Sequence, residues 1–316
     1  MRQRRLSLAG GADMKPRVVL AGGSGFLGQA LAKALIGKGY EIVILSRGAH
    51  RDSGTVRQLH WDGSKLDSWW QSIDGAKAIV NLTGRSVNCR HTPENRREIM
   101  ESRVNSVRVL GEAVARCSEP PEVWIQASSL AIYGDPGDRW CDEDAPHAEG
   151  FSEEVCKRWE GAFEKVEAPG MRKVVMRIGI VLAADQGALP VLARLTRLFL
   201  GGRVGHGRQY VSWIHVADLT RMFVEAIERP ELVGVFNVTG PNPVTNAEFM
   251  RELRRVLHRP WSPPVPAWAT HIGAFLMRTE PSLALTGRRC RPKRFLENGF
   301  HFEFPELRGA LDDLYR

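Results

Sequence analysis

Two features of many proteins are missing from this sequence of 316 residues. No apolar run reaches the roughly 20 residues that a membrane-spanning helix needs, so we expect no membrane partner. The few cysteines are scattered and none are spaced as Cys-x-x-Cys, which argues against a zinc site and against a disulfide framework. The sequence therefore predicts no metal and a reducing, cytoplasmic location. The cysteines are Cys89, Cys117, Cys141, Cys156 and Cys290.

The start of the chain lacks acidic residues before Asp13 and is rich in arginine. It also lacks the continuous apolar core of a secretory signal. A disordered tail, a weak organelle presequence and an upstream extension of a protein that starts at Met14 are all consistent with this composition. We expect a disordered tail over residues 1–14.

The formal net charge of +8 raises the question of a nucleic-acid partner. Much of the charge lies in two clusters, at Arg2, Arg4 and Arg5 and in the run Arg-Arg-Cys-Arg-Pro-Lys-Arg at residues 288–294. Neither cluster falls in a nucleic-acid-binding motif or has interleaved aromatic residues. We therefore expect no nucleic acid, and we interpret the clusters as a solvated face or a site for an acidic or phosphorylated small molecule.

A glycine-rich turn near the start is the most informative feature that is present. Residues 18–21 predict a short buried strand, residues 26–36 have helical periodicity, and Gly22-x-x-Gly25-x-x-Gly28 lies between them. A dinucleotide needs this order, because the glycines allow a tight turn, a close approach of the backbone to the pyrophosphate, and close packing of helix on strand. The alternative is a glycine-rich turn without a ligand, which the flanking strand and helix disfavour.

Strands and helices alternate along the first part of the chain. This alternation predicts parallel pairing with right-handed crossovers, and hence an α/β fold with a doubly wound parallel Rossmann sheet. The expected strands are residues 18–21, 41–45, 58–61, 76–82, 123–127 and 173–182, and the expected helices are residues 26–36, 94–117 and 152–166.

The character of the sequence changes after residue 186. We assign residues 15–186 to the dinucleotide-binding Rossmann domain, to which a helix at 218–228 and a strand at 234–238 return. Residues 187–316 form a smaller substrate lobe with a small C-terminal domain. Within this lobe we expect helices at 189–200, at 245–257 with Thr245 or Asn246 as the cap, and at 267–285, and irregular structure at 260–266.

The end of the second predicted strand indicates which cofactor binds. Folds of this type that prefer NAD place an Asp or Glu there to hold the adenosine ribose hydroxyls. Here the position reads Ser46-Arg47. An arginine can clamp a 2′-phosphate and Ser46 can donate a hydrogen bond to it, which favours NADP over NAD. The alternative is a surface arginine at a strand end.

The ordered motifs of the chain resemble those of the extended short-chain dehydrogenase/reductase superfamily, and within it the NADP-binding epimerase-like family that carries a small C-terminal domain of unassigned role. The resemblance runs from about residue 15 to the C-terminus. The matching segments are Gly-Gly-Ser-Gly-Phe-Leu-Gly (22–28), Ser-Arg (46–47), Asn-Leu-Thr-Gly (81–84), Ser-Arg-Val (102–104), Trp-Glu (159–160), Arg-Ile-Gly-Ile-Val-Leu (177–182), Ser-Trp-Ile-His-Val-Ala-Asp (212–218), Thr-Asn-Ala-Glu-Phe (245–249), the basic run with its preceding glycine (287–294) and Gly-Phe-His-Phe-Glu-Phe-Pro-Glu-Leu (299–307).

The resemblance implies a set of NADP(H)-binding residues. Arg103 stands where extended members often have asparagine, and plain core packing is the alternative for Leu82 and Val181. The implied roles are the pyrophosphate for Gly22, Gly23, Ser24, Gly25, Phe26 and Leu27, the 2′-phosphate for Ser46 and Arg47, the adenine for Asp62, the ribose for Leu82, Thr83 and Gly84, the cofactor-facing side of the next helix for Glu98 and Arg103, and the nicotinamide end for Val181.

The resemblance also implies a catalytic set, and here the sequence departs from it. Active members use Ser/Thr with Tyr-x-x-x-Lys, in which the tyrosine exchanges a proton with the substrate. Ser129 stands where the serine belongs, and Tyr133 is a candidate proton donor, but alignment on Trp159-Glu160 puts Ser152 and Cys156 in the places of the tyrosine and the lysine. The alternative for Ser129 is a polar residue that closes a strand.

Other proton carriers are less well placed. Lys157 is about 100° around the helix from Cys156 and need not face the cofactor. We interpret Cys156 as a buried filler, His206 as solvated, His215 as a buried histidine bonded to backbone, and Glu143 as capping or solvated.

The sequence thus predicts an NADP(H)-dependent oxidoreductase, or a nucleoside-diphosphate-sugar-epimerase-like protein, that acts on an unidentified small molecule as a monomer or homodimer. Loss of the Tyr/Lys pair keeps open the alternative of a catalytically reduced NADP(H) sensor. Ser129, the aromatic-rich segment at 210–213 and the glycine loop at 201–207 favour an enzyme.

Overall fold

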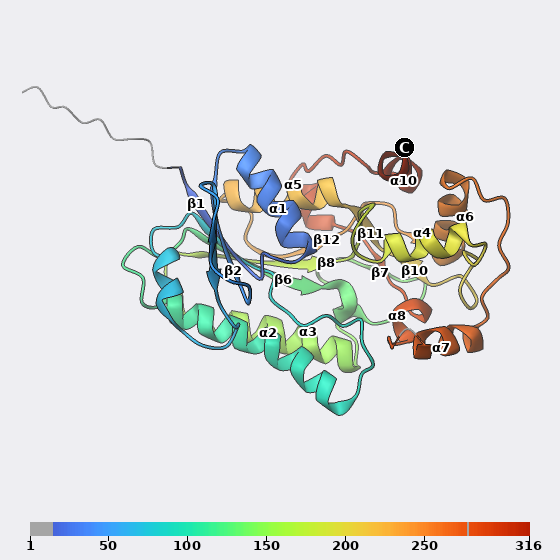
Figure 1. Ribbon diagram of the computed structural model, residues 1–316, viewed down its shortest axis with the longest axis horizontal. Coiled ribbons are helices and arrows are strands. Elements are labelled where there is room, and N and C mark those ends of the chain that lie inside the picture. Colours follow the sequence, from blue (N-terminus) through green and yellow to red (C-terminus); the bar gives the residue numbers. More distant parts are fainter. Residues whose placement is uncertain (1–14, 277) are drawn as a thin grey trace, which may run out of the picture.

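The computed structural model describes residues 15–276 and 278–316 (Figure 1). The disordered tail expected over residues 1–14 lies outside the described residues. None of the described helices is both long enough and apolar enough to span a membrane.

The elements in chain order are β1 (Arg17–Ala21), α1 (Phe26–Gly37), β2 (Glu41–Ser46), β3 (Arg51–Asp52), β4 (Val56–His60), η1 (Ser68–Ser72), β5 (Ala78–Asn81), α2 (Pro93–Val114), β6 (Val123–Ser129), η2 (Leu130–Tyr133), β7 (Trp140–Cys141), α3 (Phe151–Glu164), β8 (Arg172–Ile178), β9 (Ile180–Leu182), α4 (Leu189–Arg197), β10 (Tyr210–Val211), β11 (Trp213–His215), α5 (Val216–Glu228), β12 (Gly234–Val238), β13 (Val244–Thr245), α6 (Asn246–Val256), α7 (Ala267–Leu276), α8 (Ser282–Leu285), β14 (Arg289–Cys290), α9 (Lys293–Glu297) and α10 (Leu307–Tyr315).

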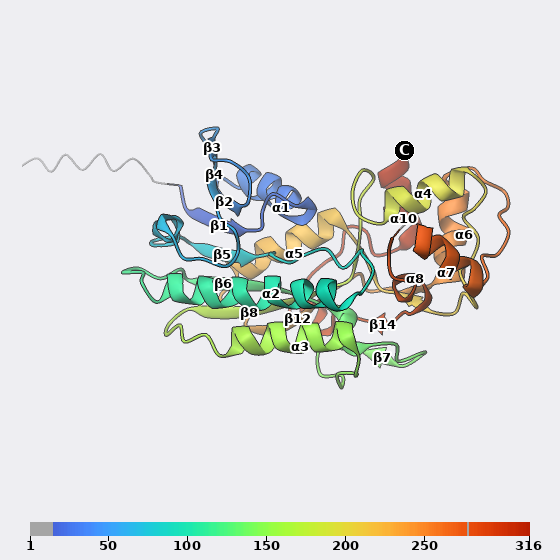
Figure 2. The same cartoon turned by 60° about the horizontal axis from the view of Figure 1, so that its bottom comes forward.

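An eight-stranded sheet in the order β12-β8-β6-β5-β1-β2-β4-β3 forms the centre of the molecule. Every pair in it is parallel except β3 with β4. Helices α1 and α5 cover one face, and α2 and α3 cover the other (Figure 2). The expected doubly wound α/β fold is therefore confirmed.

Strand side chains alternate between the two faces of this sheet. Val18 and Leu20 belong to the core under α1 and α5, whereas Val19 and Ala21 belong to the core under α2. Because both faces are covered by helices, these strands are apolar along their whole length. The chain order reverses at β1, which pairs with β2 on one side and β5 on the other. A crevice outside the carboxyl ends of the strands at this point is the usual ligand site of such sheets.

The strand expected over residues 173–182 is interrupted, and this part of the prediction is wrong. β8 ends at Ile178, and β9 leaves the large sheet to pair with β11. Gly179 allows this change of direction, because a Cβ there would lie 2.6 Å from the carbonyl oxygen of Ser212. The chain therefore turns away to meet the 212–215 segment, and the Ile180 amide donates to the Ser212 carbonyl at 2.8 Å.

The helix expected over residues 267–285 is also interrupted. It is divided into α7 and the short α8, since Arg278 takes a left-handed φ of 56° and Pro281 precedes the second helix. In contrast, the cap that was left open for α6 is Thr245, whose hydroxyl accepts from the Glu248 amide at 3.3 Å.

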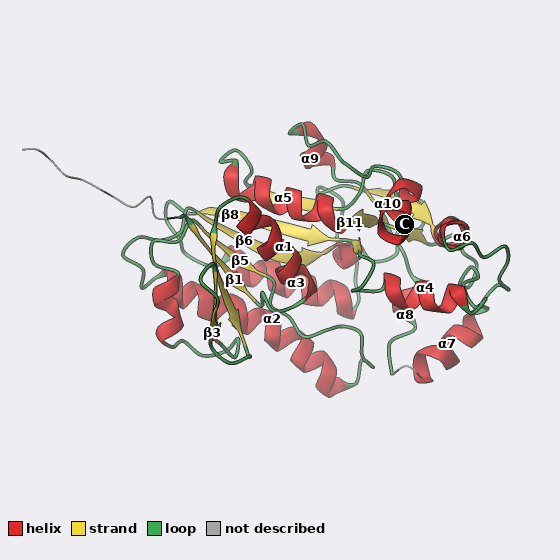
Figure 3. Ribbon diagram, turned by 45° about the horizontal axis from the view of Figure 1, so that its top comes forward, coloured by secondary structure: helices red, strands yellow, loops and turns green. Residues whose placement is uncertain are grey.

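The C-terminal part forms a separate small core at one end of the sheet. Helices α4, α6 and α10 gather there, with α7 and α8 beside them (Figure 3). Their shared core contains Trp213, Phe249, Leu253 and Leu311. Two-residue strands tie remote segments together: β7 pairs with β14, and β10 pairs with β13. Such pairings bring residues near 140 and near 290 side by side.

Candidate functional site

The glycine turn after β1 has the geometry of a phosphate cradle. Gly22 has a φ of 74°, and a Cβ there would lie 3.0 Å from the backbone of Thr83. A Cβ on Gly28 would lie 2.4 Å from the backbone of Gly23, so only glycine lets α1 pack this closely on the turn. Gly25 occupies the N-cap of α1, where no side chain caps the helix and the first turn carries no acidic residue. The first amides of α1 are thus available to an anion.

A cleft of about 770 Å³ opens over this cradle, along the carboxyl ends of β1, β2 and β5. It collects predicted residues from five separate segments. The predicted residues that line it are Gly22, Ser24, Gly25, Ser46, Arg47, Asp62, Leu82, Thr83, Gly84 and Glu98. The hydroxyl oxygen of Thr83 is buried against Gly22 and has no hydrogen-bond partner in the part of the chain that the structure describes. An orphaned polar atom at this place fits a ligand that brings its own polar groups.

The other predicted residues lie around the cleft and not on its wall. Gly23 packs on Leu20, and Leu27 packs against the core under α1. Phe26 lies against Gly187. Val181 belongs to β9, outside the large sheet.

The end of β2 carries no carboxylate. Ser46 is buried and its hydroxyl oxygen accepts from the Gly48 amide at 3.2 Å. Arg47 is exposed and, among the described residues, makes no ion pair and no hydrogen bond through its guanidinium. An unengaged cation at this position is suited to a 2′-phosphate and not to bare ribose hydroxyls.

Asp62 follows β4 at the side of the cleft. Burial opposes its ionisation, but the amides of Ser64 and Lys65 donate to its Oδ1 at 2.7 and 2.9 Å and hold the pKa of Asp62 below its usual value. Its other oxygen remains an acceptor for a base or ribose group.

The sequence interpretation missed the outer wall of the cleft, which the segment after Gly84 forms. The Arg85 guanidinium pairs with Glu98 and donates to Asn95 at 2.7 Å, and the Arg85 amide donates to Ser102 at 2.9 Å. This segment has no helical or strand periodicity, so only its position after β5 indicated a role. The missed lining residues are Leu45, Trp61, Gly63, Ser64, Arg85, Ser86, Glu101, Ser102 and Asn105.

Arg103 lies directly behind Gly84 instead of facing into the cleft. A Cβ on Gly84 would lie 2.9 Å from its guanidinium carbon. The guanidinium donates to the carbonyls of Arg85 and Ile99 at 3.0 and 2.9 Å and stacks over the Trp159 ring at 5.0 Å. Burial lowers the pKa of Arg103, but an arginine stays charged. The cleft floor therefore has a fixed positive charge beneath it.

Ser129 is half-buried at the carboxyl end of β6, where its hydroxyl oxygen accepts from the Ala131 amide at 3.2 Å. Its backbone contacts the thiol of Cys156, whose pKa burial raises to about 12. Cys156 is itself buried, in agreement with its interpretation as a buried filler.

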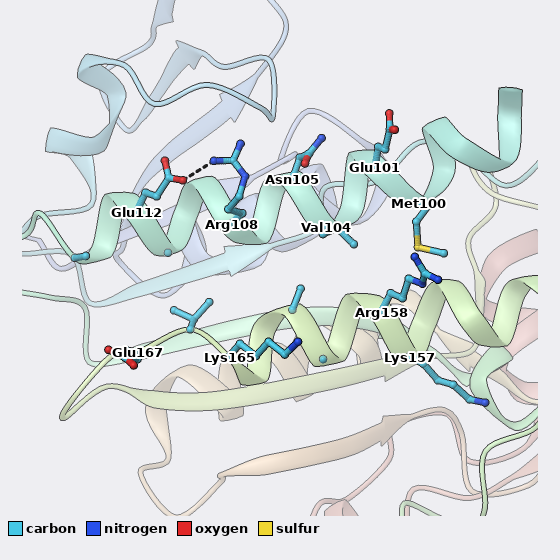
Figure 4. Close-up of a pocket in the computed structure, with 15 residues that line it drawn as sticks. Met100, Glu101, Val104, Asn105, Arg108, Glu112, Lys157, Arg158, Lys165 and Glu167 are labelled. Carbon is cyan, nitrogen blue, oxygen red and sulfur yellow. Dashed lines mark hydrogen bonds and ion pairs between the residues drawn. The ribbon is translucent and has the colours of Figure 1, made fainter.

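Lys157 does not replace the missing lysine. Its side chain belongs to a groove of about 990 Å³ between α2 and α3, on the outer surface of the molecule (Figure 4). Cys156 points into the core and Lys157 therefore lines a different face of α3.

Tyr133 is fully buried, away from the cleft lining. Its hydroxyl donates to Asn237 at 2.8 Å and accepts from Arg177, also at 2.8 Å. Burial raises its pKa far above the usual value. Arg177 also pairs with Glu160 at 2.8 Å and donates to Nε2 of His147 at 3.0 Å. This environment favours a structural role for Tyr133 over proton transfer.

The remaining candidates have local structural partners. His215 is the N-cap of α5, and its Nδ1 accepts from the Ala217 amide at 3.1 Å, so the interpretation as a buried histidine bonded to backbone is confirmed. Nδ1 of His206 accepts from the Arg208 amide at 3.0 Å. Glu143 is buried, and its Oε1 accepts from the amides of Asn237 and Arg294.

The basic run at 288–294 is largely engaged with nearby groups. Arg291 pairs with Asp142 at 3.1 Å, and Arg294 pairs with Asp144 at 2.8 Å. Arg289 lies over Trp140 and Tyr210. Lys293 also pairs with Asp144.

Arg288 differs from these neighbours. Its Nε donates to the Gly134 carbonyl at 3.0 Å, and it has no carboxylate partner among the described residues. Its charge acts on the Cys156 thiol, which also contacts the backbone of Ser129. The guanidinium of Arg288 therefore lies beside the segment that follows Ser129, without a carboxylate partner among the described residues.

Comparison with known proteins agrees with this geometry. Residues 18–239 match the NAD dependent epimerase/dehydratase family, and residues 265–314 match a domain of unknown function (DUF1731). The chain is 35% identical over 304 residues to the epimerase family protein YfhF of Bacillus subtilis, covering 94% of this chain and 97% of that protein. It is 32% identical to the human epimerase family protein SDR39U1, covering 94% of this chain and 99% of that protein.

Solved structures give the same result. A crystal structure of human epimerase family protein SDR39U1 (isoform 2) with NADPH is similar with a TM-score of 0.84 and 31% identity, covering 95% of this chain and 99% of that chain. The nucleoside-diphosphate sugar epimerase from Corynebacterium glutamicum has a TM-score of 0.77 and 29% identity, covering 95% of this chain and 58% of that chain. This chain belongs to the NAD dependent epimerase/dehydratase family and is an NAD(P)-binding, epimerase-like protein.

Proposed function

We propose that this protein is an NADP(H)-dependent oxidoreductase or epimerase that acts on a small anionic molecule. The observation that carries the proposal is the cleft itself: a glycine cradle at the start of α1, with Ser46 and Arg47 and no carboxylate at the end of β2. The similar human protein was crystallised with NADPH, which supports the choice of NADP over NAD.

The residues present fit the cofactor. Gly22, Ser24 and Gly25 would hold the pyrophosphate, and Ser46 and Arg47 would hold the 2′-phosphate. The buried Thr83 hydroxyl would gain the partner that it lacks. When bound, NADP(H) would supply hydride transfer, and the protein would supply binding, orientation and electrostatics.

On the reacting side we propose that Ser129 orients the substrate oxygen. It stands at the carboxyl end of β6, the edge of the sheet at which such folds bind ligands. We assign Tyr133 a structural role and no proton transfer, because its hydroxyl is hydrogen-bonded to Asn237 and Arg177. The positive charge of Arg103 beneath Gly84 would favour negative charge that develops on the bound molecules.

Arg288 supports the assignment of an anionic substrate. It comes from the small lobe, contacts the segment that follows Ser129, and lacks a carboxylate partner among the described residues. A carboxylate or phosphate on the substrate would supply that partner. The substrate would then lie between the Rossmann domain, residues 15–186, and the lobe of residues 187–316.

Fluorescence titration with NADPH and NADH tests the cofactor, and absorbance of bound NADPH with a panel of carbonyl compounds tests the reaction. We expect tighter binding of NADPH than NADH, and turnover that favours anionic carbonyl compounds. Tighter binding of NADH would contradict the role of Arg47.

A regulatory NADP(H) sensor is the second candidate, because the tyrosine and lysine of the usual catalytic set are absent and Tyr133 is buried. Tight NADPH binding with no turnover of any compound, and no effect of Ser129→Ala, would support the sensor over the enzyme. Binding of neither nucleotide would contradict both.

A further inference from the structure

Two buried thiols lie opposite each other where β7 and β14 meet. The strands pair in parallel, and Cys141 is the register partner of Cys290. The Arg291 amide donates to the Cys141 carbonyl at 3.0 Å, which holds this register. Both side chains are completely buried in one cluster beneath η2. Residues 149 positions apart (290 − 141) are therefore direct neighbours.

The strand geometry suits a covalent bond between them. Adjacent strands lie about 4.8 Å apart, and register partners project their side chains to the same face of the sheet. Disulfides join Cα atoms that are about 4.4–6.8 Å apart. The pair thus meets the backbone requirement without movement of either strand.

The two thiols lie in the same buried cluster and differ in reactivity. The neighbouring Cys290 thiol lowers the pKa of Cys141 against the opposing effect of burial. Burial, and then the neighbouring Cys141, raise the pKa of Cys290. Cys141 is therefore the sulfur that ionises first and attacks.

A metal site does not account for this cluster. Across residues 15–276 and 278–316, no three His, Cys, Asp or Glu side chains converge as metal ligands. The third cysteine of the cluster, Cys156, comes from α3, and among the described residues no thiol hydrogen-bonds to it. The chemistry of the cluster is that of a thiol pair.

We propose that Cys141 and Cys290 are an oxidation site that forms an intramolecular disulfide, joining the segment after Ser129 to the segment that carries Arg288. With a diazene oxidant such as diamide, the Cys141 thiolate adds to one nitrogen of the N=N bond. The Cys290 sulfur then attacks the Cys141 sulfur and releases the hydrazine. The two thiols lose two electrons and two protons, which reduce the diazene.

The disulfide adds a covalent bond between two short strands that hydrogen bonds, buried apolar contacts and ion pairs such as Arg291 with Asp142 hold in the reduced protein. It closes a long loop and therefore stabilises the folded state against an unfolded chain with fewer conformations. It also fixes the segment that carries Arg288 to the loop that follows Gly134. This consequence holds whether or not the protein turns over a substrate.

The test uses the full-length chain, treated with diamide under native conditions and then alkylated before non-reducing peptide mapping. We expect a peptide that links Cys141 to Cys290, and a melting temperature that rises by at least a few degrees and returns on reduction with dithiothreitol. Absence of that linked peptide, or linkage of either cysteine to Cys89 or Cys117 in its place, overturns the proposal.

Matched variants separate this pair from the other cysteines. Cys156→Ala removes a thiol from the same cluster and is expected to leave the crosslink intact. Cys290→Val is expected to abolish both the crosslink and the diamide-dependent rise in melting temperature. A rise that persists in Cys290→Val contradicts the proposal. If the reduced variant does not melt cooperatively, the same comparison is made with Cys141→Ala, and the peptide map of the unmodified chain decides independently of either variant.

Discussion

The cleft over the glycine turn and the core around Tyr133 lie at the carboxyl ends of different strands of one sheet, the cleft at β1, β2 and β5 and the core at β6, β8 and β12, and they differ in their chemistry. The cleft is lined by glycines, small polar residues and an unengaged arginine, and it has an orphaned hydroxyl at Thr83. Behind Ser129, by contrast, Arg177, Glu160 and Tyr133 satisfy one another in a buried network. The cleft has polar groups that are free to bind a ligand. The polar groups around Tyr133 bind one another instead, and they hold the sheet, the loop after Gly134 and the small lobe together.

The largest effect on stability is expected from a substitution that removes a charged partner from the buried network. Glu160→Ala leaves the Arg177 guanidinium, whose side chain is 4% exposed, without its carboxylate. We expect a loss of about 3–5 kcal/mol in the free energy of unfolding, measured by urea denaturation. Glu154→Ala is the matched control on the same helix, because its pair with Arg158 is exposed and contributes at most about 0.5 kcal/mol. Equal losses in the two variants would contradict the difference between the two regions.

The next largest effect is expected from a substitution that distorts the glycine turn before α1. Gly28→Ala places a Cβ against the backbone of Gly23, which cannot move as a flexible side chain can. We expect a loss of about 1–3 kcal/mol in stability and at least about tenfold weaker NADPH binding. Gly37→Ala lies in the same helix with nothing within 4 Å of the new methyl group, so stability is expected to be unchanged or slightly higher. Undiminished NADPH binding by Gly28→Ala would argue that the turn does not hold the pyrophosphate.

A smaller effect sharpens the choice of cofactor. Arg47→Gln removes the only proposed positive contact of the 2′-phosphate and is expected to weaken NADPH binding by about 10–100-fold, while NADH binding changes little. Fluorescence titration measures both. Arg51→Gln, an exposed arginine on β3, is the control and is expected to leave both affinities unchanged. Parallel losses of NADPH and NADH affinity in Arg47→Gln would refute recognition of the phosphate.

The smallest effect concerns pH and the loop that carries β7. Burial raises the pKa of Glu143 above its usual value of 4.5 in the folded protein. The folded protein therefore binds this proton more tightly than the unfolded chain does. The stability that this proton contributes is complete below the usual pKa and is lost as pH rises through the raised value. Glu143→Gln, which mimics the protonated form, is expected to unfold at higher urea concentration than the unmodified chain at pH 8, by about 1 kcal/mol or less, and to lose this advantage at low pH.

Glu149→Gln, an exposed residue of the same loop, serves as the control for that measurement and is expected to change neither midpoint. A loss of stability in Glu143→Gln at pH 8 would mean that the ionised carboxylate is the form that the Asn237 and Arg294 amides hold.

The sequence predicted the parallel sheet and the glycine turn, because both depend on local patterns. Apolar runs such as residues 18–21 and 41–45 form β1 and β2, and the glycine spacing forms the cradle that the structure places at the head of α1. The roles of the individual lining residues stay predictions until a ligand is measured. The missed Arg85 lies in a segment without periodicity, so no local pattern indicated its ion pair with Glu98.

By itself, the sequence determined the α/β alternation, the glycine turn and the Ser46-Arg47 pair, since each depends on residues close together in the chain. Only the tertiary structure decided that Gly179 ends β8, that Tyr133 is buried against Arg177, and that Cys141 lies opposite Cys290. These features arise where remote segments approach each other, and the space and partners available at such contacts depend on packing that no short stretch of sequence encodes.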